Sequence, residues 1–157
     1  MKKLGILIIT ILLAAAVLTI GNYAPQSVYA QSELTLNPIA DSYVDSEYPN
    51  DNFGGDSWLD TKSAIYTYSE DEYEFAYSKF DLSNISPDSI IDSAKLQLYC
   101  AYISSTTAHI GVHYCPNITW SEIGITWDNA PGYTSDPTDT VDIAFDDRWY
   151  SWDVAND

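Results

Sequence analysis

Basic residues are scarce in this chain of 157 residues. It has 6 Lys and Arg against 23 Asp and Glu, which gives a net charge of −17 at pH 7. Such a surface repels the phosphates of nucleic acids and the headgroups of anionic lipids. The composition therefore argues against nucleic acid as a partner and favours cations, neutral sugars or a salty medium.

The chain also lacks the short motifs of common enzyme classes. It has no Gly-x-Ser-x-Gly elbow, no phosphate-binding loop and no His-Glu-x-x-His pair. His109 and His113 are four residues apart, but on an extended strand that spacing is about 13 Å and excludes a shared zinc ion. Glu122 is the only carboxylate that we single out as a catalytic candidate, and the sequence predicts no catalytic residue beyond it.

Cysteine is limited to Cys100 and Cys115. An even pair of cysteines forms a disulfide in many exported proteins. If residues 94–103 and 109–115 form a hairpin, Cys115 lies about 13 Å along the strand from the partner of Cys100. A disulfide requires Cα atoms within about 7 Å, so this register predicts two buried free thiols.

The N-terminus has the composition of a cleavable export signal. Lys2 and Lys3 precede an apolar stretch at residues 4–20, and small or compact residues end at Ala30. This order predicts a signal peptide helix at residues 1–30 with cleavage between Ala30 and Gln31. A retained membrane anchor is the alternative, although the stretch is at the short limit of a spanning helix of about 20 residues.

Cleavage would leave residues 31–157, enough for one domain. Without Lys2 and Lys3, four basic residues remain against 23 acidic ones, a net charge of −19. This part keeps five Trp, four Phe and, without Tyr23 and Tyr29, 11 of the 13 Tyr. A chain so rich in aromatic residues can bury enough apolar area to fold, which excludes an acidic disordered tail.

Beyond the signal the sequence shows short runs of β-forming residues and no helical period. Alternation is clear at residues 94–100, where Ala94, Leu96 and Leu98 share one face, and at residues 141–145. The candidate strands are 34–37, 42–44, 58–61, 66–68, 73–80, 94–103, 109–115, 125–127, 141–145 and 150–154. Turn residues separate them, so the pattern predicts an all-β, antiparallel β-sandwich of jelly-roll type.

Several blocks in this region are familiar in combination. They are Ala40-Asp41-Ser42-Tyr43-Val44-Asp45, residues 49–55 (Pro-Asn-Asp-Asn-Phe-Gly-Gly), residues 76–83, residues 91–99, Trp120-Ser121-Glu122, residues 125–131 (Ile-Thr-Trp-Asp-Asn-Ala-Pro) and Trp152-Asp153-Val154. In this order and spacing they resemble the DNRLRE domain, also described as carbohydrate-binding module family 96 and as the disaggregatase-related repeat of methanogenic archaea.

The resemblance implies a secreted or cell-surface β-sandwich, without catalytic activity, that binds polysaccharide. Family members usually continue past the final block, so the resemblance also implies a domain truncated at its C-terminus and a missing neighbouring domain. Two other functions stay open. One is a structural or adhesive surface protein without a glycan site, and the other is a fragment of a larger polysaccharide-degrading enzyme.

Aromatic side chains beside polar turns are the candidate sugar contacts, because a pyranose ring can lay its C–H face on a π-surface. These candidates are Trp58, Tyr66, Tyr68, Tyr48, Tyr133 and Trp149. Packing in the core is the alternative for each of them. Trp120 and Trp127 lie inside the family-like blocks, and we expect them to be core residues.

Oxygen ligands gather near one predicted loop, at Asp41, Asp45, Asn50, Asp51 and Asn52. Clustered carboxylates and amides suit Ca²⁺, so a structural calcium ion is the candidate cofactor, with a solvated turn as the alternative. Asn117 begins an Asn-Ile-Thr sequence that fits N-glycosylation of an exported chain.

Overall fold

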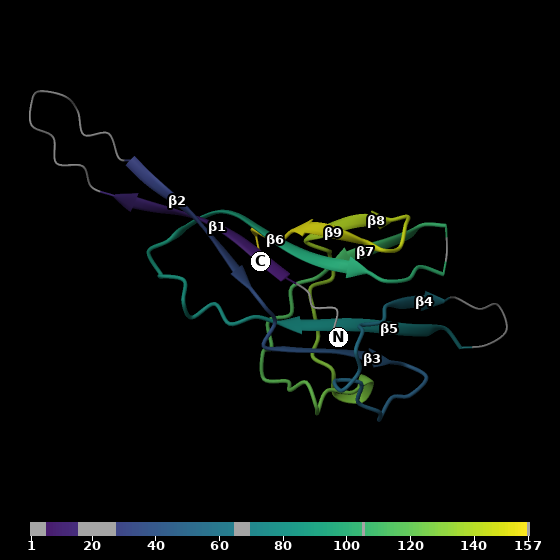
Figure 1. The fold of residues 1–157 in the computed structure, drawn as a ribbon. Helices are drawn as coiled ribbons and strands as arrows, with labels where there is room; N and C mark the ends of the chain where they lie inside the picture. Colours follow the sequence, from purple (N-terminus) through teal and green to yellow (C-terminus); the bar gives the residue numbers. More distant parts are fainter. Residues whose placement is uncertain (1–5, 16–27, 65–69, 105, 157) are drawn as a thin grey trace, which may run out of the picture.

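Short β-forming runs become strands of a two-layered, all-β structure (Figure 1). The computed structural model describes residues 6–15, 28–64, 70–104 and 106–156. All strand pairs in these ranges are antiparallel. The predicted antiparallel β-sandwich is confirmed. No helix in this part of the chain has the length and apolarity needed to cross a membrane.

One layer is a four-stranded sheet with the order β2-β1-β6-β9. Its strands are β1 (Ile6–Ala15), β2 (Val28–Leu36), β6 (Ile90–Cys100) and β9 (Arg148–Asp153). In strand β6 Ala94 is buried and Lys95 is exposed, as the sequence predicted, whereas residues 96–100 are all half-buried. Ile9 and Ala94 form one hydrophobic cluster on this sheet.

The other layer is a three-stranded sheet with the order β3-β5-β4. It consists of β3 (Ala40–Asp45), β4 (Lys62–Ala64) and β5 (Glu72–Lys79). A second hydrophobic cluster lies on one face of this sheet, where Val44 and Tyr77 pack with Ile125. Trp120 and Trp127 pack against this cluster, which confirms their core role.

A third pair, β7 (Ala108–Val112) and β8 (Asp139–Ile143), lies beside β9. The indole N–H of Trp152, which is nearly fully buried, donates to the carbonyl of Ile110 at 2.8 Å and ties β9 to β7. The phenol of Tyr150 holds the β8–β9 turn through hydrogen bonds to the backbone of Ala144 and Phe145.

Three predictions about individual elements are wrong. Residues 6–15 form strand β1 and are not helical, because an Ile-rich run with two flanking strand edges favours extended backbone. The signal peptide at residues 1–30 and its cleavage stay a prediction. Residues 125–127 are not a strand, since the 3-10 helix Trp127–Asn129 begins there. Residues 58–61 precede the strand that begins at Lys62. The predicted strand at 66–68 lies outside the described residues.

The hairpin predicted from residues 94–103 and 109–115 is also wrong. Strand β6 pairs with β1 and β9, while β7 pairs with β8. Both cysteines are nevertheless free, which confirms that prediction. They are half-buried rather than buried, and each thiol donates to a backbone carbonyl two residues later.

Candidate functional site

The connection between β3 and β4, residues 46–61, is fixed to a distant part of the chain, and we call it the anchored loop. The side-chain amide of Asn52 donates to the carbonyls of Glu122 at 2.8 Å and Ile125 at 2.6 Å, 70 and 73 residues later. The backbone N–H of Asp128 donates to the carbonyl of Pro49 at 3.0 Å. Three hydrogen bonds therefore tie the loop to residues 122–128 without making it part of a sheet.

Gly54 allows this close approach. A Cβ atom at position 54 would lie 2.0 Å from the carbonyl oxygen of Glu122, whereas one at Gly55 would meet nothing within 4 Å. Only glycine fits the first position without displacing backbone. The blocks at residues 49–55 and 120–131, which the sequence showed separately, thus meet in space.

Phe53 of the loop packs on Tyr43 of β3, which is buried. The rings of Tyr43 and Phe53 stack with centroids 4.4 Å apart, and the Tyr43 hydroxyl donates to Asp56 at 3.1 Å. Burial, that hydrogen bond and nearby acids raise the pKa of Tyr43 well above its ordinary value. Tyr43 therefore stays protonated and positions the carboxylate of Asp56.

Two candidate sugar contacts project from the anchored loop. Trp58 is 56% exposed and Tyr48 is 55% exposed. The indole of Trp58 interacts with the carboxylate of Asp60 and opposes the rise in the pKa of that carboxyl. An exposed ring therefore lies beside a carboxylate, the combination that a sugar face and its hydroxyls require.

The surroundings of Trp58 are strongly acidic. Burial raises the pKa of Asp60, and Asp56 and Asp45 raise it further, although Trp58 opposes them. Burial, Asp60 and Asp45 likewise raise the pKa of Glu74. The nearby cation, Lys62, is paired with Glu72 and lies 3.5 Å from Glu47.

The five residues predicted to bind calcium have different roles here. Asp45 is buried and its carboxylate accepts the backbone N–H of Glu47 at 2.8 Å, while the amide of Asn52 anchors the loop. Asp41 is half-buried, and Asn50 and Asp51 are exposed. No group of three or more His, Cys, Asp or Glu side chains suited to a metal occurs among the residues whose structure is given. Calcium binding stays a prediction.

The remaining aromatic candidates lie on other surfaces. Tyr133 contacts Phe75 and His113 with centroids 5.6 and 5.1 Å apart. Trp149 packs edge-to-face on Tyr99 at 5.5 Å, directly across from it in the β6–β9 pair. Tyr66 and Tyr68 lie outside the described residues. Tyr99 was not predicted, although its alternation with Leu98 and Cys100 placed it on the outer face.

A shallow cleft of about 230 Å³ lies next to the segment that anchors the loop. Asn117, Thr119, Trp120, Ser121 and Asn129 are among its lining residues. Much of its polar lining is already used. The side-chain carbonyl of Asn117 accepts hydrogen bonds from the backbone N–H and the hydroxyl of Thr119. The Asn129 side chain accepts from the backbone N–H of Thr126 and donates to the carbonyl of Gly124. Asn117 is exposed, and its glycosylation stays a prediction.

Sequence comparison decides what kind of domain this is. Residues 32–157 match the sequence profile of carbohydrate-binding module family 96. The chain belongs to this family. It is also similar to a gellan lyase from Bacillus sp., with 27% identity over 117 residues that cover 73% of this chain and 4% of that protein. The chain thus corresponds to a small fraction of that relative's length.

The residues that the sequence analysis considered for catalysis or zinc binding, Glu122, His109 and His113, all make contacts within the fold. Glu122, the single catalytic candidate, accepts a bond from Asn52 through its backbone carbonyl and lies against Gly54. His109 pairs with Asp142 across β7 and β8, and the ring of His113 bonds the carbonyl of Thr134 at 2.7 Å. Both histidines are therefore engaged in contacts within the fold.

Proposed function

We propose that this chain is a secreted or cell-surface module without catalytic activity that holds a neutral polysaccharide on the anchored loop. Trp58 supplies the main stacking surface, Tyr48 a second one, and Asp56 and Asp60 accept hydrogen bonds from sugar hydroxyls. The observation that carries the proposal is the exposed indole of Trp58 beside the carboxylate of Asp60, in a chain of family 96.

Rigidity supports the anchored loop over the other aromatic surfaces. Ordering a mobile loop on binding would oppose association, and a loop already fixed by Asn52 and Gly54 avoids much of that loss. The side chains of Asn117, Thr119 and Asn129 in the cleft beside it are engaged in hydrogen bonds within the fold, which makes the cleft the weaker candidate.

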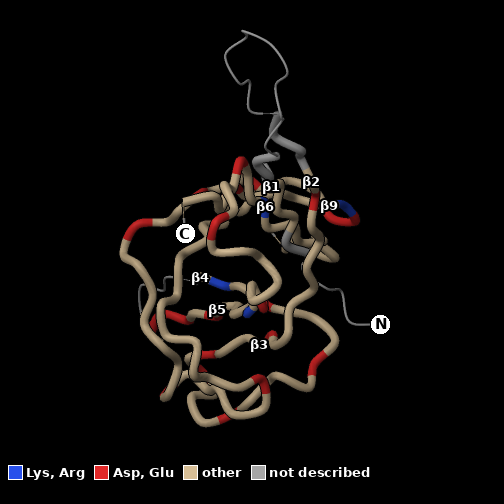
Figure 2. The backbone as a smooth tube through the Cα atoms, turned by 90° about the vertical axis from the view of Figure 1, so that its left-hand side faces the viewer, with Lys and Arg blue, Asp and Glu red and all other residues tan. Residues whose placement is uncertain are grey.

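Charge supports a neutral ligand. The net charge is −17, and Figure 2 shows acidic positions around much of the molecule with few basic ones. At the loop itself the positive charge of Lys62 is balanced by Glu47 and Glu72. A polymer of uronic acids would meet like charges there, whereas a neutral glycan needs only stacking and hydrogen bonds.

Replacement of Trp58 tests the site. We expect Trp58→Ala to weaken retention on a neutral polysaccharide about tenfold, or ~1.4 kcal/mol, because the stacking surface is lost. Affinity electrophoresis in gels containing glucans, mannans, xylans or galactans measures this, with alginate, pectate and gellan as acidic comparisons. Circular dichroism should show an unchanged fold, since Trp58 is more than half exposed.

Trp149→Ala is the matched control, because Trp149 is 49% exposed but lies on the other sheet. It should leave retention unchanged. The proposed site is wrong if Trp149→Ala abolishes retention and Trp58→Ala does not. Retention of acidic polymers alone would contradict the neutral ligand.

Export is tested separately. The N-terminal sequence of protein recovered from the medium or the cell surface should begin at Gln31. An intact N-terminus on membrane-bound protein would instead support a retained anchor.

A further inference from the structure

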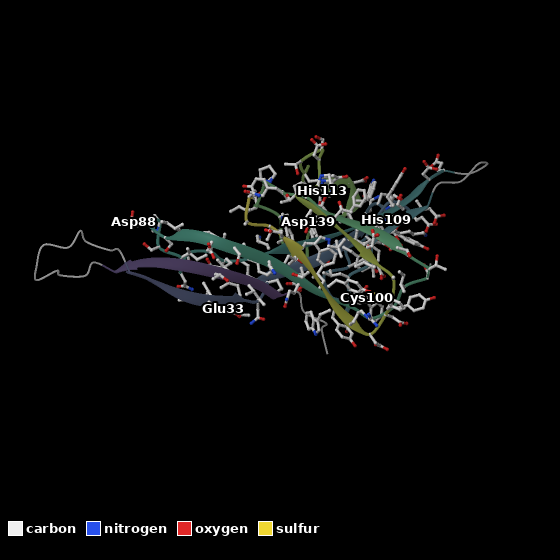
Figure 3. All side chains as sticks on the ribbon, turned by 90° about the horizontal axis from the view of Figure 1, so that it is seen from above. Glu33, Asp88, Cys100, His109, His113 and Asp139 are labelled. Carbon is white, nitrogen blue, oxygen red and sulfur yellow. The ribbon has the colours of Figure 1, made fainter. Side chains whose placement is uncertain are left out.

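Strand β1 is an internal strand of the four-stranded sheet. It pairs antiparallel with β2 along one edge and with β6 along the other, so that Ile9 lies opposite both Leu34 and Ala94. Figure 3 looks down on this layer, with β1 between the strand of Glu33 and β6. An internal strand satisfies two rows of backbone hydrogen bonds at once.

Ile9 also sits in the centre of a hydrophobic cluster. It is 4% exposed. The half-buried residues that pack on Ile9 and Ala94 are Leu34, Leu36, Phe80, Ile85 and Val154. Removal of β1 would open this cluster to water as well as two strand edges.

The same residues belong to the segment with the composition of an export signal. Cleavage after Ala30 would remove all of β1 and the first three residues of β2, Val28–Ala30. The inference below rests on this cleavage, which is part of the proposed function. The exported domain would then have a gap one strand wide between β2 and β6, which we call the strand slot.

The strand slot cannot close by a small movement. Strands β2 and β6 are each antiparallel to β1 and lie two strand spacings apart, about 10 Å. Both would present unpaired N–H and C=O groups, and open edges of that kind recruit further strands.

We propose that the strand slot accepts one extended strand from a different polypeptide. That strand runs antiparallel to β6, as β1 does, and carries an apolar side chain at the position of Ile9. Backbone pairing supplies affinity, and the buried position supplies selectivity.

The charged residues that border the strand slot indicate which side chains the incoming strand should carry. The position of Ile8 lies between Lys95 on β6 and Thr35 on β2, so an acidic side chain suits it. The position of Thr10 lies between Ser93 and Glu33, so a basic side chain suits that one. The preferred partner is therefore an acidic–apolar–basic strand.

A second copy of this chain is the poorer occupant. After cleavage each copy would have a slot of its own and no β1 to donate.

Strand exchange in the full-length chain tests the inference. A protease site introduced between residues 20 and 21 allows β1 to be cut from the folded protein without being removed. We expect the cut N-terminal peptide to stay bound on size-exclusion chromatography. Excess labelled peptide with the sequence of residues 6–15 and a lysine tail should then replace it.

Peptide variants provide the controls, and the protein itself is unchanged. Ile9→Asp in the peptide should weaken uptake at least tenfold, while Ile8→Glu together with Thr10→Lys should strengthen it, measured by fluorescence anisotropy. Equal uptake of the Ile9→Asp peptide would overturn the inference. So would release of β1 with no change in melting temperature, or dimerisation of the cut protein.

Glycan retention of the same cut samples separates this inference from the proposed function. The anchored loop lies on the other sheet, so retention should persist whether or not the slot is filled. Loss of retention in the uncut protein would count against the proposed function alone.

Discussion

At the scale of single residues, Asn52 and Gly54 determine the shape of the candidate site. The amide of Asn52 satisfies two carbonyls, those of Glu122 and Ile125, and Gly54 lets the same backbone approach. The anchoring role of Asn52 could not be predicted, because composition gives residue types and not the direction of an amide. Contacts across 70 residues cannot be inferred from local spacing.

Gly54→Ala should destabilise the domain by about 1–3 kcal/mol, since the new methyl group overlaps the Glu122 carbonyl, 2.0 Å away. Gly55→Ala is the control, with nothing within 4 Å of the added atom. Urea unfolding followed by tryptophan fluorescence measures both. Equal stability of the two variants would show that the loop is not held against Glu122.

At the scale of elements, alternation and turn residues predicted most strands. Residues 73–80 and 94–103 were recognised because their apolar residues recur at every second position, and β5 and β6 overlap these ranges but begin one and four residues earlier. The strand predicted at residues 125–127 was wrong, although Ile125 and Trp127 have strand propensity. The Asn129 side chain caps the backbone of Thr126 at 2.8 Å, and this local bond favours the 3-10 turn.

The sequence predicted the strands better than it predicted which strands pair with each other. Strand β6 was assigned to its neighbour in sequence, but it pairs with β9 and β1. Short connections favour hairpins in general, and only the tertiary packing of Trp152 and Ile9 selects the longer-range pairs. The exposed candidates Trp58, Tyr48 and Trp149 were predictable from flanking turns, but their division among separate surfaces was not.

The acidic face of the β3-β5-β4 sheet makes stability depend on pH. Burial first, and neighbouring acids second, raise the pKa values of Asp60 and Glu74. The folded state then binds protons more readily than the unfolded state, so stability is greater in mild acid. It is lost as the pH rises from about 4, the ordinary carboxyl value, through the raised values.

Thermal melts between pH 4 and pH 7 should therefore show a higher melting temperature towards the acidic end. The double variant Asp60→Asn, Glu74→Gln should flatten this dependence. Asp136→Asn with Asp146→Asn removes the same charge from exposed positions and should flatten it less. An identical slope in both double variants would contradict the assignment to Asp60 and Glu74.

At the scale of the whole molecule, the charge of −17 predicts self-repulsion that dissolved salt screens. Raising NaCl from 0.05 to 0.5 M, a range in which the Debye length falls to about 4 Å, should raise the melting temperature at pH 7. Retention on a neutral glycan should stay nearly constant in the same series. A melting temperature that is independent of salt would show that the charges are already well separated.

The same series at pH 4 is its control. About half of the carboxylates are then protonated, the net charge is smaller, and the effect of salt should shrink. An equally large effect at both pH values would identify a general action of the salt rather than screening.

The long separation of interacting segments also bears on the order of events during export. The amide of Asn52 has no carbonyl to bind until Glu122 and Ile125 are available, and β6, which pairs with the earlier strand β1, gains its second neighbour only when β9 follows at Arg148–Asp153. Contacts so distant in sequence form late. In the export that we propose, a chain that passes N-terminus first through a narrow pore therefore completes these contacts only after its last strand is outside.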